Sequence, residues 1–565
     1  MKKIPIQKNK EYIVNIIDNG FEGEGIAKIE DYTIFIPGAI KGEKIKTLIV
    51  KVQSSYAFGK IIEIIEKSKY RTEADCDTYK RCGGCNLRHV DYEETLNMKQ
   101  NAVQSLVNKT LKTPIEVEKT VAMGNPYYYR NKLQFPIGRG KDGKPIMGVF
   151  ANRTHEIIQV QECAIQDKEA IKIARLVVDL IRKFDITVYD EKTGKGLMRH
   201  IVIKVAKSTG EYMAILVING NELPHSKEIA LELKEKFDCI KSVILNSNTK
   251  NTNVILGEKN TTIYGNDFIT DKLGDYYFKI SPLSFYQVNP VQAEALYNYA
   301  IEAAEITKND VVFDLYCGIG TISIFMASSA KDVYGVEIVE QAIEMARDNA
   351  KINEVENVHF IAGDTEKVLT DLIENKNIVP DVVIVDPPRK GLDSTTINNI
   401  LKVKPRRLVY ISCNPASLVR DLKMLEDVYD IRVIQPFDMF CFTRSCGECG
   451  GVRISLKKFL YSLLLFCIGS CRSNRCKIYC TYRYCNGIWN FGISKKRSRW
   501  IMKKRLYKIE EGKKISGVCG GIAEYFDIDP TLIRLAWILF SAFVGSGIIA
   551  YIIAAIVMPK KSDVM

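Results

Sequence analysis

The stretch that decides the fold is Val311-Val312-Phe313-Asp314-Leu315-Tyr316-Cys317-Gly318-Ile319-Gly320-Thr321. It begins with a mostly apolar run that is typical of a buried strand, and its glycines predict a tight turn into a helix. A second strand, predicted at 333–337, ends in Glu337 at the spacing of a nucleoside-binding unit. The stretch therefore predicts a Rossmann-like α/β domain with a ligand site at the glycine turn.

The glycine turn and the acidic residue indicate which nucleoside would bind. Gly318 and Gly320 let a ligand approach the backbone, and Glu337 can accept hydrogen bonds from two ribose hydroxyls. The turn lacks the full G-x-G-x-x-G of a dinucleotide site, which favours S-adenosylmethionine over NAD. The alternative is a glycine turn that serves the fold alone.

From about residue 290 onward, predicted strands alternate with predicted helices, as in a doubly wound parallel sheet. The strand at 382–385 leads into Asp386-Pro387-Pro388-Arg389. The strand at 408–411 leads into Ser412-Cys413-Asn414-Pro415 and a predicted helix at 416–425. Ligands of such sheets bind outside the carboxyl ends of the strands, so we expect the cofactor, Asp386 and Cys413 to converge.

Cys413 is the candidate nucleophile of this sheet edge. A thiol at a strand-to-helix turn is exposed, and the N-terminus of the following helix favours its thiolate form. The alternative is the ordinary role of a lone cysteine, which is a small buried hydrophobic residue.

Residues 1–67 alternate short β-like runs with turns, which predicts a small barrel. The Gly-x-Gly ahead of Ile26-Ala27-Lys28 and the later Phe35-Ile36-Pro37-Gly38-Ala39 resemble the TRAM domain, an OB-like barrel that binds RNA. A barrel without a ligand is the alternative.

Three closely spaced cysteines follow the predicted barrel, and a fourth lies far downstream: Cys76, Cys82, Cys85 and Cys163. No histidine completes the set at zinc-finger spacing. Four thiolates suit either an iron–sulfur cluster or zinc, and spacing alone does not choose between them. The set predicts a structural metal centre or a platform for RNA rather than an electron carrier.

The cysteines belong to residues 68–285, which mix predicted helices and strands and are expected to form one α+β central domain. The stretch 127–136 interleaves tyrosines with basic residues. Such a pattern can stack unpaired bases and hold phosphates, although ordinary cross-strand aromatic residues would give the same pattern.

Charge and cysteine usage limit the partners and the location. The net charge is +13, but 20 basic against 6 acidic side chains lie in residues 451–565, which leaves 60 against 61 for residues 1–450. Bulk charge therefore gives no argument for RNA or DNA binding by the body of the chain. No apolar signal-peptide core follows Met1-Lys2-Lys3, so we expect a cytoplasmic, reducing location in which clustered cysteines bind metal or catalyse.

Five motifs occur in the order found in the RNA 5-methyluridine methyltransferases, which the chain resembles over residues 1–445. They are Gln134 with its flanking Tyr-Arg-Asn-Lys, Ser284–Asn289, Asp314–Gly320, Asp386–Arg389 and Ser412–Pro415. The cysteine spacing resembles the iron–sulfur branch of this family, which modifies 23S ribosomal RNA. A tRNA substrate is the alternative.

The resemblance implies a role for each site residue. It implies cofactor contacts from Gln287, Tyr316, Glu337 and Asp386, Cys413 as the nucleophile, and a [4Fe–4S] cluster on the four cysteines. Carbon 5 of uracil is too weak a nucleophile to take a methyl group from a sulfonium by itself. Addition of a thiolate at carbon 6 makes carbon 5 electron-rich, and a stacked uracil must first be flipped out.

Two other functions compete with this interpretation. An amino-group methyltransferase of DNA or RNA would follow Asp-Pro-Pro with an aromatic residue, where this chain has Arg389. A membrane-bound regulatory protein, with an inactive methyltransferase body and a redox-sensing cysteine cluster, would form no covalent adduct with RNA.

The chain departs from the family pattern after Phe440. The family has Asp-Met-Phe-Pro-x-Thr-x-His-Val-Glu, whose glutamate is the proton-abstracting base. Here the stretch is Asp438-Met439-Phe440-Cys441-Phe442-Thr443-Arg444-Ser445-Cys446-Gly447-Glu448. The histidine is missing, and Glu448, the implied base, lies one residue late.

The end of the chain differs in composition from the rest. Residues 457–502 are cysteine-rich without periodicity, which indicates a shifted reading frame or a gene fusion; a genuine cysteine-rich linker or zinc site is the alternative. Residues 503–565 resemble the phage-shock-protein C domain. Within them 535–558 are apolar, uncharged and long enough to span a bilayer, which predicts a C-terminal membrane helix. A buried core helix, or a hairpin broken at Gly545 and Gly547, is the alternative.

Overall fold

The computed structural model describes residues 4–152, 154–443 and 449–456. The chain divides into two units, 1–471 and 472–565, and all described residues belong to the first. The predicted base Glu448, the predicted linker at 457–502 and the predicted membrane segment at 535–558 lie outside the described residues. Among the helices that are described, none is both long enough and apolar enough to cross a membrane.

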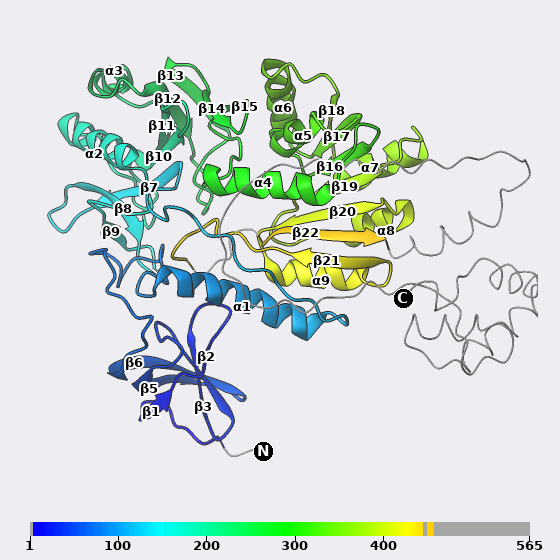
Figure 1. Ribbon diagram of the computed structural model, residues 1–565. Helices are drawn as coiled ribbons and strands as arrows, with labels where there is room; N and C mark the ends of the chain where they lie inside the picture. Colours follow the sequence, from blue (N-terminus) through cyan, green and yellow to red (C-terminus); the bar gives the residue numbers. More distant parts are fainter. Residues whose placement is uncertain (1–3, 153, 444–448, 457–565) are drawn as a thin grey trace, which may run out of the picture. The chain divides into compact units, whose positions relative to one another are not determined.

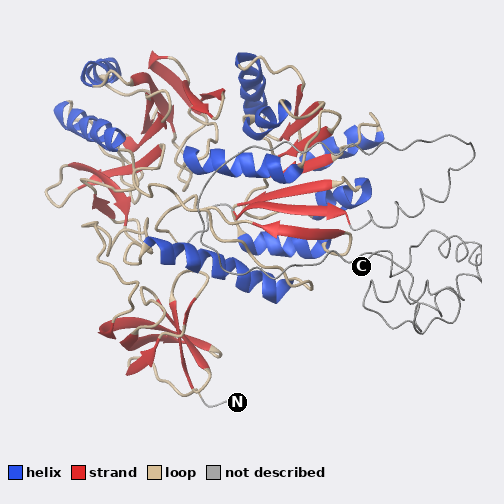
Figure 2. Cartoon of the chain, viewed as in Figure 1, coloured by secondary structure: helices blue, strands red, loops and turns tan. Residues whose placement is uncertain are grey.

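The first sheet has six strands in the order β1-β5-β6-β4-β3-β2 (Figures 1 and 2). The strands are β1 (Glu11–Asn15), β2 (Asp18–Asn19), β3 (Gly25–Ile29), β4 (Tyr32–Ile36), β5 (Lys44–Val52) and β6 (Tyr56–Glu66). Buried residues alternate with more exposed ones along β4 and β5, and β1 also packs against β3, so the sheet encloses one apolar core. This sheet is the small β domain predicted for residues 1–67.

The second sheet has seven strands in the order β13-β12-β11-β10-β7-β8-β9. Its elements are β7 (Lys132–Arg139), β8 (Pro145–Phe150), β9 (Ile157–Gln159), α2 (Lys168–Lys183), β10 (Met198–Ala206), β11 (Glu211–Ile218), α3 (Ser226–Lys236), β12 (Ile240–Ser247) and β13 (Lys259–Gly265). Helices α2 and α3 cover one face, and the hairpin of β14 (Ile269–Leu273) and β15 (Tyr276–Ile280) packs on the other. The central strands β10 and β11 are therefore buried on both faces.

The third sheet confirms the predicted α/β domain, with the strand order β18-β17-β16-β19-β20-β22-β21. Its elements are α4 (Pro290–Ala304), β16 (Val311–Leu315), α5 (Thr321–Ala327), β17 (Asp332–Glu337), α6 (Glu340–Ile352), β18 (Val358–Ala362), α7 (Thr365–Glu374), β19 (Val382–Val385), α8 (Ser394–Val403), β20 (Arg407–Ser412), α9 (Pro415–Leu425), β21 (Tyr429–Ile434) and β22 (Cys449–Leu456). Neighbouring strands from β18 to β20 are parallel, whereas β22 runs antiparallel to β20 and β21.

Helices cover both faces of this sheet (Figure 1): α4, α5 and α6 share one core, and α7, α8 and α9 share the other. The strand order reverses at β16, which lies between β17 and β19. Ligands of doubly wound sheets bind beside such a reversal, at the carboxyl ends of the strands.

Helix α1 (Tyr92–Thr110) belongs to the core of the third sheet, although it precedes the second sheet in sequence. The Asp91 side chain caps it by accepting hydrogen bonds from the backbone N–H groups of Glu93 and Glu94. Val103 and Val107, four residues apart and so on one face, join the core that contains α9, and α1 packs along α9 (Figure 1).

Candidate active site

The glycine turn after β16 is shaped to leave room for a ligand. Tyr316, Gly318 and Gly320 have φ values of 72°, 55° and 80°. A Cβ added at Gly318 would meet no atom within 4 Å, whereas one at Gly320 would come within 2.5 Å of the Phe360 ring. Gly318 thus borders open space that a ligand can enter, and Gly320 permits close packing beneath it.

Glu337 is held at this turn from the end of β17. Its carboxylate accepts hydrogen bonds from the backbone N–H of Gly318 at 3.3 Å and of Val339 at 3.0 Å. The backbone N–H groups of Tyr316 and Cys317 both donate to the Val336 carbonyl, at 2.8 and 3.0 Å. The structure therefore brings together the turn and the acid that the sequence predicts as a nucleoside site.

Asp314 is fully buried and Tyr316 partly buried beside the same turn. Burial raises the pKa of the Tyr316 phenol to about 12, so the side chain is a neutral hydrogen-bonding group. Burial also raises the pKa of the fully buried Asp314 to about 7, although Ser323 donates a hydrogen bond of 2.5 Å to one of its oxygens. The other oxygen, Oδ1, is buried and has no hydrogen-bond partner among the described residues.

Cys413 lies between β20 and α9, as the sequence predicts, and its side chain is partly exposed. Asn414 caps α9 by accepting from the backbone N–H of Ala416 at 3.1 Å. The Asn414 side chain also donates to the Arg389 carbonyl at 3.0 Å. This hydrogen bond ties the loop of Cys413 to the loop of Asp386, which follows the neighbouring strand β19.

Gln287 is fixed by the second sheet. Its side chain is almost completely buried. The Asn131 side chain donates to the Gln287 carbonyl at 2.8 Å, and the Asn131 backbone N–H donates to the Val288 carbonyl at 2.9 Å. Asn289 caps α4 through the backbone N–H of Gln292. Gln287 thus lies between the residue that precedes β7 and the start of α4.

The implied base Glu448 lies outside the described residues, but its neighbour Cys449 is described as the first residue of β22. Cys449 is the register partner of Ser412 in the ladder of β20 and β22. The residue after Glu448 is therefore paired with the residue before Cys413.

The four predicted metal ligands line a single cavity of about 160 Å³. One water needs only about 15 Å³, so the cavity has room for a group larger than one water. Its walls also carry two guanidinium groups, from Arg88 and Arg130. The donor set and the space fit a four-thiolate cluster. Within the described ranges, however, no three histidine, cysteine or acidic side chains are placed to hold a single metal ion.

The thiols in this cavity influence one another. Burial, and then the neighbouring Cys163, raise the pKa of Cys85 to about 12. Burial also raises the pKa values of Cys82 and Cys163. Without a bound cation these groups are thiols, and binding of a metal or cluster must displace their protons.

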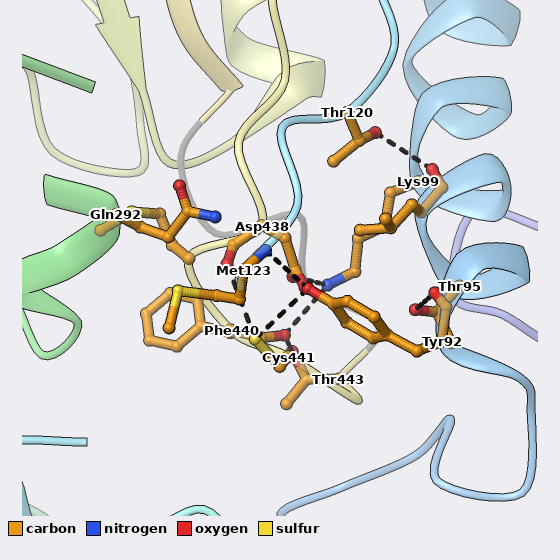
Figure 3. Close-up of polar contacts among 12 residues, drawn as sticks. Tyr92, Thr95, Lys99, Thr120, Met123, Gln292, Asp438, Phe440, Cys441 and Thr443 are labelled. Atoms are coloured by element: carbon orange, nitrogen blue, oxygen red, sulfur yellow. Dashed lines mark hydrogen bonds and ion pairs between the residues drawn. The ribbon is translucent and has the colours of Figure 1, made fainter. Parts of the chain in front are cut away.

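The segment 436–443, which leads toward Glu448, is fastened by a buried ion pair (Figure 3). Lys99 of α1 pairs with Asp438, both side chains being almost fully buried, and also donates to the Phe440 carbonyl at 3.0 Å. The Tyr92 hydroxyl donates to the second Asp438 oxygen at 2.7 Å and accepts from the Met123 backbone N–H at 2.9 Å. All charges in this cluster are thus paired or hydrogen-bonded.

The same segment contacts the cysteine cavity. The backbone N–H groups of Asn86 and Leu87 both donate to the Phe442 carbonyl at 3.0 Å. Cys85 and Cys163 pack on the small apolar cluster that contains Phe442. The segment therefore joins α1, the cysteine region and the strand that precedes the implied base.

Several of these positioning residues escaped the sequence analysis. Asn414, followed by Pro415, is a typical helix N-cap and could have been identified as such. Asn131 lies in a stretch that was singled out for its aromatic and basic residues and as a family motif, and no role was predicted for Asn131 itself. Lys99 and Asp438 are 339 positions apart, and no local pattern links them.

Comparison with known families matches three parts of the chain. A tRNA (Uracil-5-)-methyltransferase model matches residues 91–456, a TRAM domain model residues 5–62 and a PspC domain model residues 504–561. These matches confirm the resemblances inferred for the body, the N-terminal barrel and the C-terminal segment.

Relatives agree with the family matches. A Clostridium tetani protein described as an uncharacterized RNA methyltransferase is 47% identical over 443 residues, 78% of this chain and 96% of that protein. A similarly described protein of Clostridium acetobutylicum is 46% identical over 446 residues, with the same coverage. The solved structure of Pyrococcus abyssi tRNA (uracil-54, C5)-methyltransferase in complex with S-adenosyl-L-homocysteine is similar, with a TM-score of 0.63 and 27% identity. It covers 78% of this chain and 99% of that chain.

Proposed function

The chain belongs to the RNA uracil-5-methyltransferase family and is an S-adenosylmethionine-dependent RNA methyltransferase, and we propose that it methylates carbon 5 of a uracil in 23S ribosomal RNA through a covalent adduct with Cys413. The observation that carries the proposal is the hydrogen bond between Asn414 and the Arg389 carbonyl, since it holds the loops of Cys413 and Asp386 together. A tRNA uracil, the substrate named for the Pyrococcus abyssi neighbour, is the alternative target.

The proposed reaction balances in atoms and electrons. The Cys413 thiolate adds to carbon 6 of the flipped uracil, and the electron pair of the 5,6 double bond moves into an enolate. Carbon 5 then takes the methyl group from S-adenosylmethionine, whose sulfur–methyl bond breaks to leave S-adenosylhomocysteine. A base removes the carbon-5 proton, and the released electron pair restores the double bond and expels the thiolate.

The residues of the glycine turn and its surroundings would hold the methyl donor. We assign the ribose to Glu337, because acidic residues at this strand end accept from ribose hydroxyls. Gly318 supplies the open space, and Tyr316, Gln287 and Asp386 complete the set of contacts that the family implies. A methyl donor held here and Cys413 both lie at the carboxyl edge of the sheet, which is what the reaction needs.

We assign the base to Glu448. Support comes from the pairing of Cys449 with Ser412, because consecutive Cα atoms are only about 3.8 Å apart. Cys449, the described neighbour of Glu448, is thus paired beside the turn that carries Cys413, although Glu448 stands one residue out of the family pattern.

Substitution of the two proposed catalytic residues tests the mechanism. Cys413→Ala should lower methyl transfer by at least about a thousandfold while leaving the affinity for S-adenosylmethionine unchanged, because the thiol acts only on the uracil. Glu448→Gln should still form the adduct but release little methylated product. Cys239→Ala, which removes a thiol of the central domain, is the matched control. Full methyl-transfer activity of Cys413→Ala would refute the proposed mechanism.

We also propose a [4Fe–4S] cluster on Cys76, Cys82, Cys85 and Cys163. The four thiols share a cavity whose volume exceeds the needs of one ion, and Arg88 and Arg130 offset part of the negative charge of the thiolates. Zinc is the alternative. Iron and sulfide analysis of anaerobically purified protein should show a cluster that Cys85→Ser loses and Cys239→Ser keeps, whereas zinc without iron would refute the cluster.

The last part of the proposed function concerns membrane attachment through the C-terminal segment. We propose that residues 535–558 attach a cytoplasmic methyltransferase to a membrane. This proposal rests on the length and apolarity of the segment and on the PspC match at 504–561.

A further inference from the structure

Two lysines face each other across neighbouring strands of the second sheet. Lys132 of β7 and Lys204 of β10 are register partners in an antiparallel ladder. Lys204 is only 5% exposed, and Lys132 is partly buried. Like charges directly opposite each other in a ladder repel and destabilise it. The chain therefore maintains an unfavourable pair at this position.

No carboxylate neutralises this pair in the part of the chain that the structure describes. The Lys204 ammonium donates only to the carbonyls of Ser281 and Ser284, at 2.7 and 2.8 Å. The Lys132 ammonium makes no hydrogen bond or ion pair with any described residue. Burial lowers the pKa of Lys132, and the nearby Arg130 adds to this effect. Burial, and then the charge of Lys132, lower the pKa of Lys204 well below its usual value, so the two side chains carry their full charge together only when an anion is bound beside them. A buried positive cluster without a counter-charge is costly unless an anion joins it.

The two ammonium groups border a small cavity of about 40 Å³, next to the loop that carries Gln287. Asn131 and Phe285 also line it, and Phe285 is 70% exposed. Since Asn131 donates to the Gln287 carbonyl, this cavity adjoins the proposed methyl-donor site. The cavity admits the oxygens of an anion but is too small for a nucleobase, whereas the exposed ring of Phe285 offers a surface for one.

We propose that this cavity binds a phosphodiester of the substrate RNA beside the target uridine, with Lys132 and Lys204 as its cationic contacts and Phe285 as a stacking surface for a neighbouring base. The inference rests on the proposed function. A phosphate between the two ammonium groups replaces their repulsion by two charge-assisted contacts. Aromatic side chains beside a basic groove are the usual means of holding unpaired nucleotides.

The other anion at this site would be the carboxylate of S-adenosylmethionine, and the two predict different results. A lysine that contacts an RNA phosphate contributes about one to the slope of log affinity against log salt concentration. A lysine that contacts the cofactor carboxylate contributes to cofactor affinity instead.

Lys132→Gln and its control Lys236→Gln, an exposed lysine in the last turn of α3, test the inference. Affinity for an unmodified 23S ribosomal RNA fragment is measured between 50 and roughly 300 mM salt, and affinity for S-adenosylmethionine separately. Lys132→Gln should lower the salt slope by about one and leave cofactor affinity unchanged. Lys236→Gln should change neither.

An unchanged salt slope for Lys132→Gln, or a loss of cofactor affinity instead, would overturn the inference. If the wild-type protein still methylated the same RNA, the proposed function would be unaffected by that result. Phe285→Ala provides a second test of the inference, again measured as RNA affinity and its salt slope. Because Phe285 is exposed and uncharged, it should weaken RNA binding severalfold without altering the salt slope. Absence of RNA methylation by the wild-type protein would instead refute the proposed function.

Discussion

Asp314 shows how one buried residue can make stability depend on pH. Its carboxyl is fully buried, one oxygen has no hydrogen-bond partner, and burial raises its pKa to about 7. In the unfolded chain the pKa is about 4. Between these values the folded protein holds a proton that the unfolded chain has lost, so the contribution of Asp314 to stability is greatest below pH 4 and is lost as pH rises through 7.

Asp314→Asn should remove this dependence, because the amide stays neutral at every pH. In urea titrations without cofactor, the free energy of unfolding of the variant minus that of the wild type should increase as pH rises from 4 to 7.5, because only the wild type loses stability over this range. A difference that stays constant across that range would show that Asp314 does not titrate there.

Single residues at the sheet edge were the most predictable from sequence. Cys413 and Glu337 each follow directly on an apolar strand, so local pattern alone fixes their place at the carboxyl edge. Lys204 was not predictable, because a lysine in an apolar run normally marks an exposed position. Only the ladder with β7 and the carbonyls of a distant turn explain its burial.

Among the larger elements, helix α1 holds the segment 436–443 in place. Lys99 and Asp438 form an ion pair with both side chains almost fully buried, and Tyr92 satisfies the second carboxylate oxygen. Removing one partner of such a pair leaves an uncompensated charge inside the protein, which typically costs about 3–5 kcal/mol.

Lys99→Met should therefore lower the free energy of unfolding by about 3–5 kcal/mol, as measured by urea denaturation. Lys109→Met, at an exposed position of the same helix, is the control and should have almost no effect. Adding Asp438→Asn to Lys99→Met should restore part of the loss, because the carboxylate charge is no longer left alone. Equal stability of Lys99→Met and Lys109→Met would show that the pair contributes nothing.

The bounds of the helices and strands were predictable from the sequence, but the packing of these elements against one another was not. The predicted strands at 382–385 and 408–411 and the predicted helix at 416–425 agree with β19, β20 and α9 to within a residue. Helix α1 lies within residues 68–285, which were expected to form one central domain, yet its Val103 and Val107 pack into the core beside α9. Periodicity shows that a helix has an apolar face, but it carries no information about which distant element covers that face.

For the whole molecule, the described fold is complete without the last hundred residues. Strand β22 ends at Leu456 and closes the third sheet between β20 and β21. A chain of residues 1–456 should therefore fold, bind S-adenosylmethionine and methylate RNA at the rate of the full chain.

Co-sedimentation with lipid vesicles separates the two parts of the chain. The full chain should pellet with vesicles through residues 535–558, and the 1–456 chain should stay in the supernatant. Equal sedimentation of both chains would refute the proposed membrane attachment, and loss of methylation by the shorter chain would show that the C-terminal region takes part in catalysis.

The central claim is that Cys413 attacks carbon 6 of a uracil in RNA, and trapping with RNA that contains 5-fluorouracil tests it most directly. Fluorine cannot leave carbon 5 as a cation, so the adduct should persist after methyl transfer and survive denaturing gel electrophoresis. Mass spectrometry should place it on Cys413 and identify the nucleotide. Absence of any adduct from active protein, or an adduct on another cysteine, would contradict this account.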